Sequence, residues 1–144
     1  MIFWDSSAVV PLLIDEAATP EARALLEIDA AMLVWWGTSV ECLSAIARRE
    51  RDATLPRPVA RRARLALGDL AGAWNEIQPS EEVREHAGRL FLRHRLRAAD
   101  AFQLGAALTW TRGRPRRHLL ATLDDRLSTA ALGEGFEIAL PVEP

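Results

Sequence analysis

Lysine is missing from this sequence: all eighteen basic residues are arginine. This absence excludes mechanisms that need a lysine, such as P-loop nucleotide hydrolysis, Schiff-base catalysis and receiver-domain phosphotransfer. Cysteine is nearly missing as well, because Cys42 is the only one, so an internal disulfide is excluded and a reducing compartment is indicated. We interpret Cys42 as a small buried side chain rather than a nucleophile, which would need a histidine and an electropositive setting.

Long hydrophobic runs are missing too. No apolar stretch approaches the roughly 20 residues needed to cross a bilayer, and the first ten residues carry no basic leader. We therefore expect a cytoplasmic protein without a membrane partner. The chain has 144 residues, of which 49% are hydrophobic and 26% charged, enough for one core and too few for two. We expect residues 1–144 to form a single domain.

The charges are unevenly distributed, although the net charge is only −2. Residues 1–30 contain six acids against the single Arg23, whereas residues 48–64 contain seven arginines against Glu50 and Asp52. Two more basic clusters lie at residues 84–97 and 112–117. This pattern predicts basic faces around an acidic pocket, while ordinary solvated helix faces account equally well for about half of these arginines.

The hydrophobic pattern predicts an alternation of strands and helices. Four short β-prone runs are expected to form strands, at residues 2–4, 33–36, 119–122 and 136–140. Helical periodicity is found at residues 22–28, 40–51, 59–73, 82–92, 99–111 and 126–132. Strands separated by helices need crossover connections, which predicts an α/β fold with a mostly parallel sheet covered on both faces. The consecutive helices from about residue 39 to residue 95 interrupt the alternation, and we expect them to form a helical arm beside the sheet.

Four acidic residues lie where predicted strands end or helices begin. Asp5 and Asp124 each follow a strand, Glu41 lies in the first turn of a helix, and Asp100 opens the helix at residues 99–111. In an open parallel sheet, ligands bind at the edge where the strands end. Each acid alone is equally well explained by helix capping and the helix macrodipole. Their joint placement is what predicts a site.

Converging carboxylates need a counter-charge. Two of them about 5 Å apart repel by roughly 3 kcal/mol at an effective dielectric constant near 20. A hard divalent cation such as Mg²⁺ or Mn²⁺ prefers oxygen ligands and would relieve this repulsion. Such a site suits phosphodiester hydrolysis. Ser7 and Thr122 are placed to hydrogen-bond a water molecule, a metal-binding side chain or a phosphate; satisfying nearby backbone groups at a strand end is an equally good interpretation. Arg48 lies seven residues after Glu41 on the same helix face and is a candidate for binding a substrate phosphate.

Four segments in this order resemble the PIN domain, and more narrowly the VapC-type toxins of bacterial and archaeal toxin–antitoxin pairs. The segments are FWDSSAV at residues 3–9, TSVE at residues 38–41 with Ala45 and Arg48 on the following turns, LRAADAFQLGAAL at residues 96–108, and ATLDDRL at residues 121–127. The resemblance extends from the first predicted strand nearly to the last, and residues 99–108 are its most specific part.

This resemblance implies a three-layer α/β/α sandwich, Mg²⁺- or Mn²⁺-dependent cleavage of RNA that leaves a 3′-hydroxyl and a 5′-phosphate, a homodimer, and an antitoxin whose C-terminal segment covers the active-site groove. It also implies residue roles. Asp5, Glu41, Asp100 and Asp124 match the catalytic metal-binding quartet, Ser7 and Thr122 match supporting positions, and Arg48 and Arg97 are the candidates for contacting the substrate. The Asp124-Asp125 doublet leaves a choice, and Asp124 keeps the spacing of the family, with Asp125 as a supporting residue.

Two other functions are compatible with parts of this pattern. A catalytically weak PIN-like module that binds protein or RNA would keep the fold and use its acids to receive an antitoxin arginine or a structural ion. A phosphatase of the haloacid-dehalogenase type also places an aspartate after its first strand, but it needs a second one two residues later, where this chain has Ser7, and a lysine. We therefore favour the toxin ribonuclease.

Overall fold

The strands form one parallel sheet. The computed structural model describes residues 1–140, and within them five strands are hydrogen-bonded in the order β3-β2-β1-β4-β5. The strands are β1 (Phe3–Trp4), β2 (Leu33–Trp35), β3 (Asn75–Ile77), β4 (Leu119–Ala121) and β5 (Glu137–Ile138). All four strand pairings are parallel. The chain direction across the sheet reverses beside the central strand β1, so the carboxyl ends of β1 and β4 border a topological switch point.

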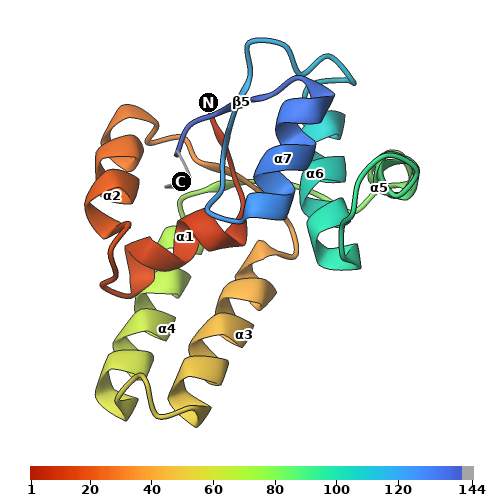
Figure 1. Ribbon diagram of the computed structural model, residues 1–144. Coiled ribbons are helices and arrows are strands. Elements are labelled where there is room, and N and C mark those ends of the chain that lie inside the picture. The colour runs from red at the N-terminus through yellow and green to blue at the C-terminus, as the bar shows by residue number, and fades with distance from the viewer. Residues whose placement is uncertain (141–144) are drawn as a thin grey trace.

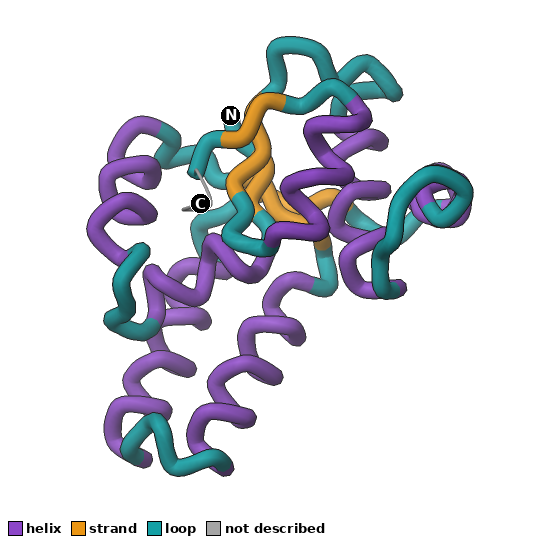
Figure 2. Tube along the Cα trace, viewed as in Figure 1, coloured by secondary structure: helices purple, strands orange, loops and turns teal. Residues whose placement is uncertain are grey.

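Helices cover both faces of the sheet (Figures 1 and 2). They are α1 (Ser6–Leu13), α2 (Thr19–Ile28), α3 (Thr38–Arg51), α4 (Arg57–Ala71), α5 (Glu81–Leu90), α6 (Ala98–Trp110) and α7 (Asp125–Glu134). Successive strand residues point to opposite faces. Trp4 accordingly packs in an apolar cluster with residues of α1, α3 and α4, while Phe3 packs in a second cluster with residues of α5, α6 and α7. The predicted three-layer α/β/α sandwich is confirmed.

The helical arm is shorter than the sequence predicts. Helices α3 and α4 extend together beyond the edge of the sheet, as Figure 1 shows. The expected continuation of the arm to residue 95 is wrong, because β3 returns to the sheet and pairs with β2, and α5 packs against α6. The strand Asn75–Ile77 was not predicted because it is only three residues long, two of them polar, and lies at an edge with partly exposed side chains.

Helix α1 is the other element that the sequence did not predict. Its residues SSAVVPLL carry Pro11 inside the helix and bury Ala8, Val9, Val10 and Pro11 in succession, which leaves no amphipathic period to detect. The remaining predicted helices and strands are present with shifts of a few residues at their ends. Within residues 1–140, no helix combines the length and the apolarity required to cross a membrane.

Candidate active site

Asp5 occupies the centre of the switch point. It directly follows β1, its backbone N–H donates to the carbonyl of Ala121 on β4 at 3.0 Å, and only 4% of the residue is exposed. Its Oδ2 accepts hydrogen bonds from the hydroxyls of Ser7 and, at 2.7 Å, Thr122. Burial raises the pKa of Asp5; the Ser7 and Thr122 hydrogen bonds lower it, and the negative charge of Asp124 raises it further.

The hydroxyls of Ser7 and Thr122 bond the backbone that follows β4 as well as the carboxylate of Asp5, which follows β1. The Ser7 Oγ accepts from the Leu123 backbone N–H at 2.8 Å, and the Thr122 Oγ1 accepts from the Asp124 backbone N–H at 3.1 Å. The two hydroxyl oxygens lie 3.2 Å apart. Both roles that the sequence left open for these hydroxyls, backbone satisfaction and support of the acid, are therefore present at once.

Glu41 approaches Asp5 from the first turn of α3. The pKa of Glu41 is raised to about 7, chiefly by burial; a hydrogen bond from Gln103 acts to lower this pKa, and the charges of Asp5 and Asp100 act to raise it. The Gln103 Nε2 donates to Glu41 Oε2 and to Thr38 Oγ1, the latter at 3.0 Å. These couplings place Glu41 close to two of the other three predicted acids.

Gln103 is a site residue that the sequence reasoning missed. It is 1% exposed, and its side-chain carbonyl Oε1 has no hydrogen-bond partner in residues 1–140. A buried amide without a full set of partners destabilises the fold, so its presence in an otherwise apolar helix needs another reason. The available signal was its spacing: Gln103 lies three residues after Asp100, on the same face of α6.

Asp100 lies in the first turn of α6, as predicted. Its Oδ2 accepts from the backbone N–H of Arg97 at 3.2 Å, and the Arg97 Nε lies 4.0 Å from the same oxygen. The side chain of Asp100 is 18% exposed whereas that of Arg97 is 74% exposed, so solvent screens this ion pair. The negative charge of Asp100 is one of the causes that raise the pKa of Glu41.

The structure separates the two members of the Asp124-Asp125 doublet. Asp124 is the N-cap of α7, where its Oδ1 accepts from the Leu127 backbone N–H at 2.9 Å, and its charge acts on Asp5. Asp125 is exposed and lines a different cavity. This arrangement favours Asp124 as the fourth acid of the group, in agreement with the spacing argument.

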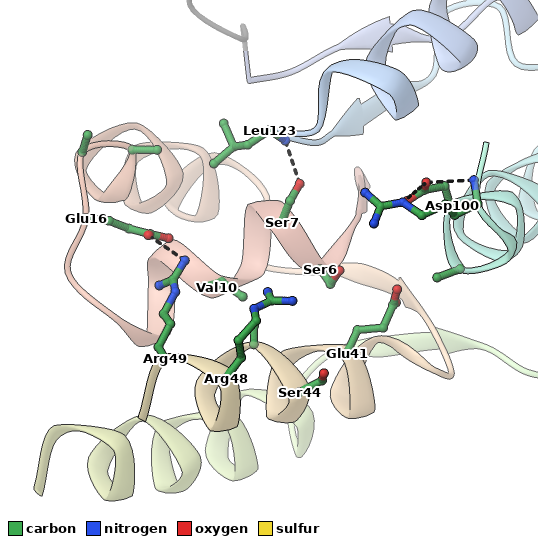
Figure 3. Close-up of a pocket in the computed structure, with 15 residues that line it drawn as sticks. Ser6, Ser7, Val10, Glu16, Glu41, Ser44, Arg48, Arg49, Asp100 and Leu123 are labelled. Atoms are coloured by element: carbon green, nitrogen blue, oxygen red, sulfur yellow. Dashed lines mark hydrogen bonds and ion pairs between the residues drawn. The ribbon is translucent and has the colours of Figure 1, made fainter. Parts of the chain in front are cut away.

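A cavity of about 680 Å³ is lined by two of the four predicted acids, Glu41 and Asp100, whereas Asp5 and Asp124 are not among its lining residues (Figure 3). It is bordered by α1, α3 and the first turn of α6. Glu41 and Asp100 line it together with both arginines predicted to contact the substrate, Arg48 and Arg97. Arg49 also lines it, but pairs with Glu16 at 3.1 Å. Arg48 has no ion-pair partner within residues 1–140, which leaves its guanidinium free for an anion.

The four acids do not form a ready-made metal cage. In the described part of the chain, no three His, Cys, Asp or Glu side chains are close enough together to hold a metal ion as they stand. Each carboxylate uses an oxygen for an internal hydrogen bond, to Ser7 and Thr122, to Gln103, to the Arg97 backbone or to the Leu127 backbone. The structure places Asp5 and Asp124 after the neighbouring strands β1 and β4, and Glu41 and Asp100 in the lining of one cavity.

Cys42 is buried beside this group and is not a nucleophile. Burial, together with the negative charges of Glu41 and Asp5, raises the pKa of its thiol to about 12. Thiolate is the reactive form of cysteine, so this thiol is inert at neutral pH. The prediction of a buried small side chain is confirmed.

Comparison with known proteins places the chain in a family. The PIN domain family model matches residues 2–132. Ribonuclease VapC45 of Mycobacterium tuberculosis is 32% identical over 139 residues, which cover 96% of this chain and 94% of the relative.

Two solved structures share the fold. M. tuberculosis VapC20, described as a sarcin–ricin loop cleaving toxin, matches 90% of this chain and 95% of its own, with a TM-score of 0.66 and 18% identity. A toxin–antitoxin complex from Klebsiella pneumoniae matches 89% of this chain and 90% of its own, with a TM-score of 0.62 and 19% identity. The chain belongs to the PIN domain family, as a relative of the VapC ribonucleases.

Proposed function

We propose that this protein is a metal-dependent endoribonuclease that hydrolyses RNA phosphodiester bonds and acts as the toxin of a toxin–antitoxin pair. The observation that supports the proposal most is the position of the acids: Asp5 and Asp124 follow the neighbouring strands β1 and β4 at the switch point of a PIN-domain sheet, and Glu41 and Asp100 line a cavity that Ser7 and Leu123 also line. The 32% identity to a protein named a VapC ribonuclease supports the same activity.

The donor set fits Mg²⁺ or Mn²⁺. Asp5 is nearly fully buried, and Glu41 has a raised pKa, so both carboxylates carry a desolvation cost that no buried cationic side chain in residues 1–140 offsets. Buried charges are tolerated when they are paired or bind metals, and hard cations prefer carboxylate oxygens. When bound, such a cation supplies charge neutralisation at the phosphate and activation of a water molecule.

The other residues of the cavity have supporting roles in this proposal. Ser7 and Thr122 fix the orientation of the Asp5 carboxylate through their hydrogen bonds. Arg48 and Arg97 line the same cavity and suit the binding of RNA phosphates, because a guanidinium can donate two parallel hydrogen bonds to one phosphate. We assign Asp125 a weaker supporting role, since it faces the neighbouring cavity.

The proposed protein partners are an antitoxin and a second copy of the chain. An antitoxin is supported by the likeness in fold to a toxin–antitoxin complex from Klebsiella pneumoniae. An arginine of such a partner would find unpaired carboxylate oxygens in the acid-lined cavity. A homodimer would bury apolar side chains that the isolated chain exposes next to the site, among them Trp36 at 52% and Val40 at 65% exposure.

One alternative keeps the fold without efficient catalysis. The absence of a preassembled group of three metal ligands within residues 1–140 favours a PIN-like module that binds RNA or protein. The ribonuclease remains the better proposal because a pure binding module gives no reason to bury the polar side chains of Asp5 and Gln103.

The test is cleavage of RNA by purified protein free of any antitoxin. We expect cleavage in Mg²⁺ or Mn²⁺, none in EDTA, and a loss of at least about a hundredfold in Asp5→Asn. Asp69→Asn on the exposed side of α4 is the matched control and should cleave like the wild type. Metal titration followed by melting temperature gives a second readout. Equal cleavage by Asp5→Asn and wild type would refute the site, and metal binding without cleavage would favour the module.

A further inference from the structure

A second cavity, of about 340 Å³, is lined by the turn that joins α5 to α6 and by the first turns of α7. The same two chain segments border both this cavity and the first one. The turn between α5 and α6 contributes Arg97 to the first cavity and Arg93, His94 and Arg95 to the second. The segment that leads into α7 contributes Leu123 to the first cavity and Asp125 and Arg126 to the second. A polymer bound in the first cavity that continues past Asp100 would therefore meet the second cavity next.

The turn that carries these arginines is anchored to the far end of α7. The side chain of Glu134 is only 8% exposed, and its two oxygens lie 2.8 Å from Arg93 Nη2 and 2.7 Å from His94 Nε2. Gly133 makes room for this contact, because a Cβ there would lie 3.0 Å from His94 Cε1. Ordering the turn in advance lowers the entropy cost of using its side chains for binding.

Arg93 is occupied by this anchor, but Arg95 and Arg126 are not. Both are exposed, both line the cavity, and neither has an ion-pair or hydrogen-bond partner within residues 1–140. Asp125 is the only carboxylate among the cavity residues, and Thr129 adds an exposed hydroxyl. Two unpaired guanidiniums in one cavity are suited to a phosphate group, which each can bind through a pair of hydrogen bonds.

We propose that Arg95 and Arg126 form a subsite for a backbone phosphate of the RNA, outside the bond that is cleaved. This inference rests on the proposed function. Figure 3 shows Arg48 and Arg49 on one side of the first cavity and Asp100 on the other. The RNA strand enters on the Arg48 side, crosses the acids, and continues past Asp100 into the second cavity. The subsite thus extends the length of RNA that the enzyme holds and fixes a second point on the path of the strand.

The test measures RNA binding and cleavage separately. Binding of a labelled single-stranded RNA of about twelve nucleotides is titrated over a range of salt concentrations with Arg95→Ala/Arg126→Ala, in an Asp5→Asn background. Each lost phosphate contact should lower the slope of log K against log salt by about 0.7. We expect a slope change of about 0.7 to 1.4 and affinity weaker by about tenfold. With RNA of about four nucleotides, too short to span both cavities, the double variant should bind like its parent.

The matched control is Arg61→Ala/Arg62→Ala. It also removes two exposed arginines from the lining of a cavity, but on α4 of the arm. An equal effect of the two double variants would mean that only overall charge matters and would overturn the subsite. Arg95→Lys/Arg126→Lys should restore the salt slope and only part of the affinity, because lysine keeps the charge without the fork of donors. If the alanine pair weakened binding of an acidic peptide and left RNA binding intact, the partner would be a protein and the proposal would be wrong.

Cleavage kinetics distinguish this inference from the proposed function. On the longer RNA, Arg95→Ala/Arg126→Ala in the otherwise wild-type chain should raise KM about tenfold and change kcat by less than about twofold, as expected when binding is lost away from the reacting bond. Normal cleavage with an unchanged KM and salt slope would overturn the subsite alone. No cleavage by the wild type, with the slope difference intact, would overturn the proposed activity and leave the RNA subsite standing.

Discussion

Two faces of helix α6 are built in opposite ways. Toward α5, the helix presents Gly105, where a Cβ would lie 2.9 Å from the backbone nitrogen of Ala87 and 3.0 Å from the carbonyl of Val83. Toward the carboxyl edge of the sheet, the same helix presents Asp100 and Gln103 to a group of mutually repelling acids. One face is packed as closely as two helix backbones allow, while the other collects buried polar groups.

The contrast indicates that the acidic face of α6, and not the packed face, lowers the stability of the fold. Close backbone contact on the α5 side gains dispersion energy with no polar cost. On the acidic side, an unsatisfied Gln103 oxygen, a desolvated Asp5 and a Glu41 with a raised pKa each lower the free energy of unfolding. Substitutions on the first face should therefore reduce stability, and suitable substitutions on the second should reduce activity while preserving or raising stability.

We expect the largest loss of RNA cleavage on substitution of Asp124. Its two roles, as an acid of the site and as the N-cap of α7, can be separated by the choice of substitution. Asparagine caps a helix as well as aspartate does, so Asp124→Asn should keep the melting temperature while cleavage of RNA falls about a hundredfold, or about 2.7 kcal/mol. Asp124→Ala should lose the same activity and, in addition, about 1 kcal/mol of stability with the cap. RNA cleavage assays and thermal unfolding measure the two effects.

Asp125→Asn provides the comparison within the doublet. Because Asp125 is exposed and lines the second cavity, its substitution should reduce cleavage far less than Asp124→Asn does. A large loss in Asp125→Asn with near-normal cleavage by Asp124→Asn would exchange the roles of the two residues, and would also show that the N-cap position of α7 is purely structural.

The next largest effect is expected on stability, from a substitution of Gly105 on the face of α6 that packs against α5. Gly105→Ala must push apart α5 and α6, because the atoms that the new methyl group meets belong to the backbone and cannot rotate away. We expect a loss of about 1 to 3 kcal/mol in the free energy of unfolding, measured by denaturant titration. Gly68→Ala on α4 is the matched control. A Cβ there meets nothing within 4 Å, so alanine should stabilise that helix by about 0.5 to 1 kcal/mol. Equal outcomes for the two variants would contradict the close packing.

The sequence predicted the acidic face better than the packed one. The positions of Asp5, Glu41, Asp100 and Asp124 follow from where strands end and helices begin, and element boundaries are visible in the hydrophobic pattern. That α5 packs against α6 instead of extending the arm was not visible, because it depends on the short edge strand β3. The arm was therefore predicted to run too far.

Side-chain partners were the part that sequence could not supply. Gln103 meets Glu41 across a separation of 62 residues, and His94 meets Glu134 across 40, so neither pair leaves a local pattern. The first pair depends on how α6 packs beside α3, and the second on how the turn after α5 packs beside the end of α7. Arg48 and Arg97 line the same cavity as Glu41 and Asp100, because Arg48 lies on the helix that carries Glu41 and Arg97 directly precedes the helix that carries Asp100. Their contact with the substrate stays a prediction.

The smallest effect is a gain in stability at Glu41. Its carboxyl has a pKa of about 7 in the folded chain, raised from its ordinary value of 4.5. In metal-free protein, the folded state therefore binds more protons than the unfolded state between these two values, and stability falls as the pH rises through this window. Glu41→Gln removes the ionisation and can still accept the hydrogen bond from Gln103. After allowance for its partial exposure, we expect the variant to be more stable than wild type by about 1 kcal/mol at pH 8 in EDTA.

The pH dependence and the metal dependence of this gain identify its cause. The advantage of Glu41→Gln should shrink toward pH 5, where the wild-type carboxyl is protonated, and Glu27→Gln, an exposed matched control on α2, should show no such trend. Added Mg²⁺ or Mn²⁺ should stabilise the wild type more than Glu41→Gln and so reduce or reverse the difference, since binding to the folded state alone raises stability. A variant less stable than wild type at pH 8 in EDTA would mean that the Glu41 carboxylate stabilises the fold, and the contrast between the two faces of α6 would no longer hold.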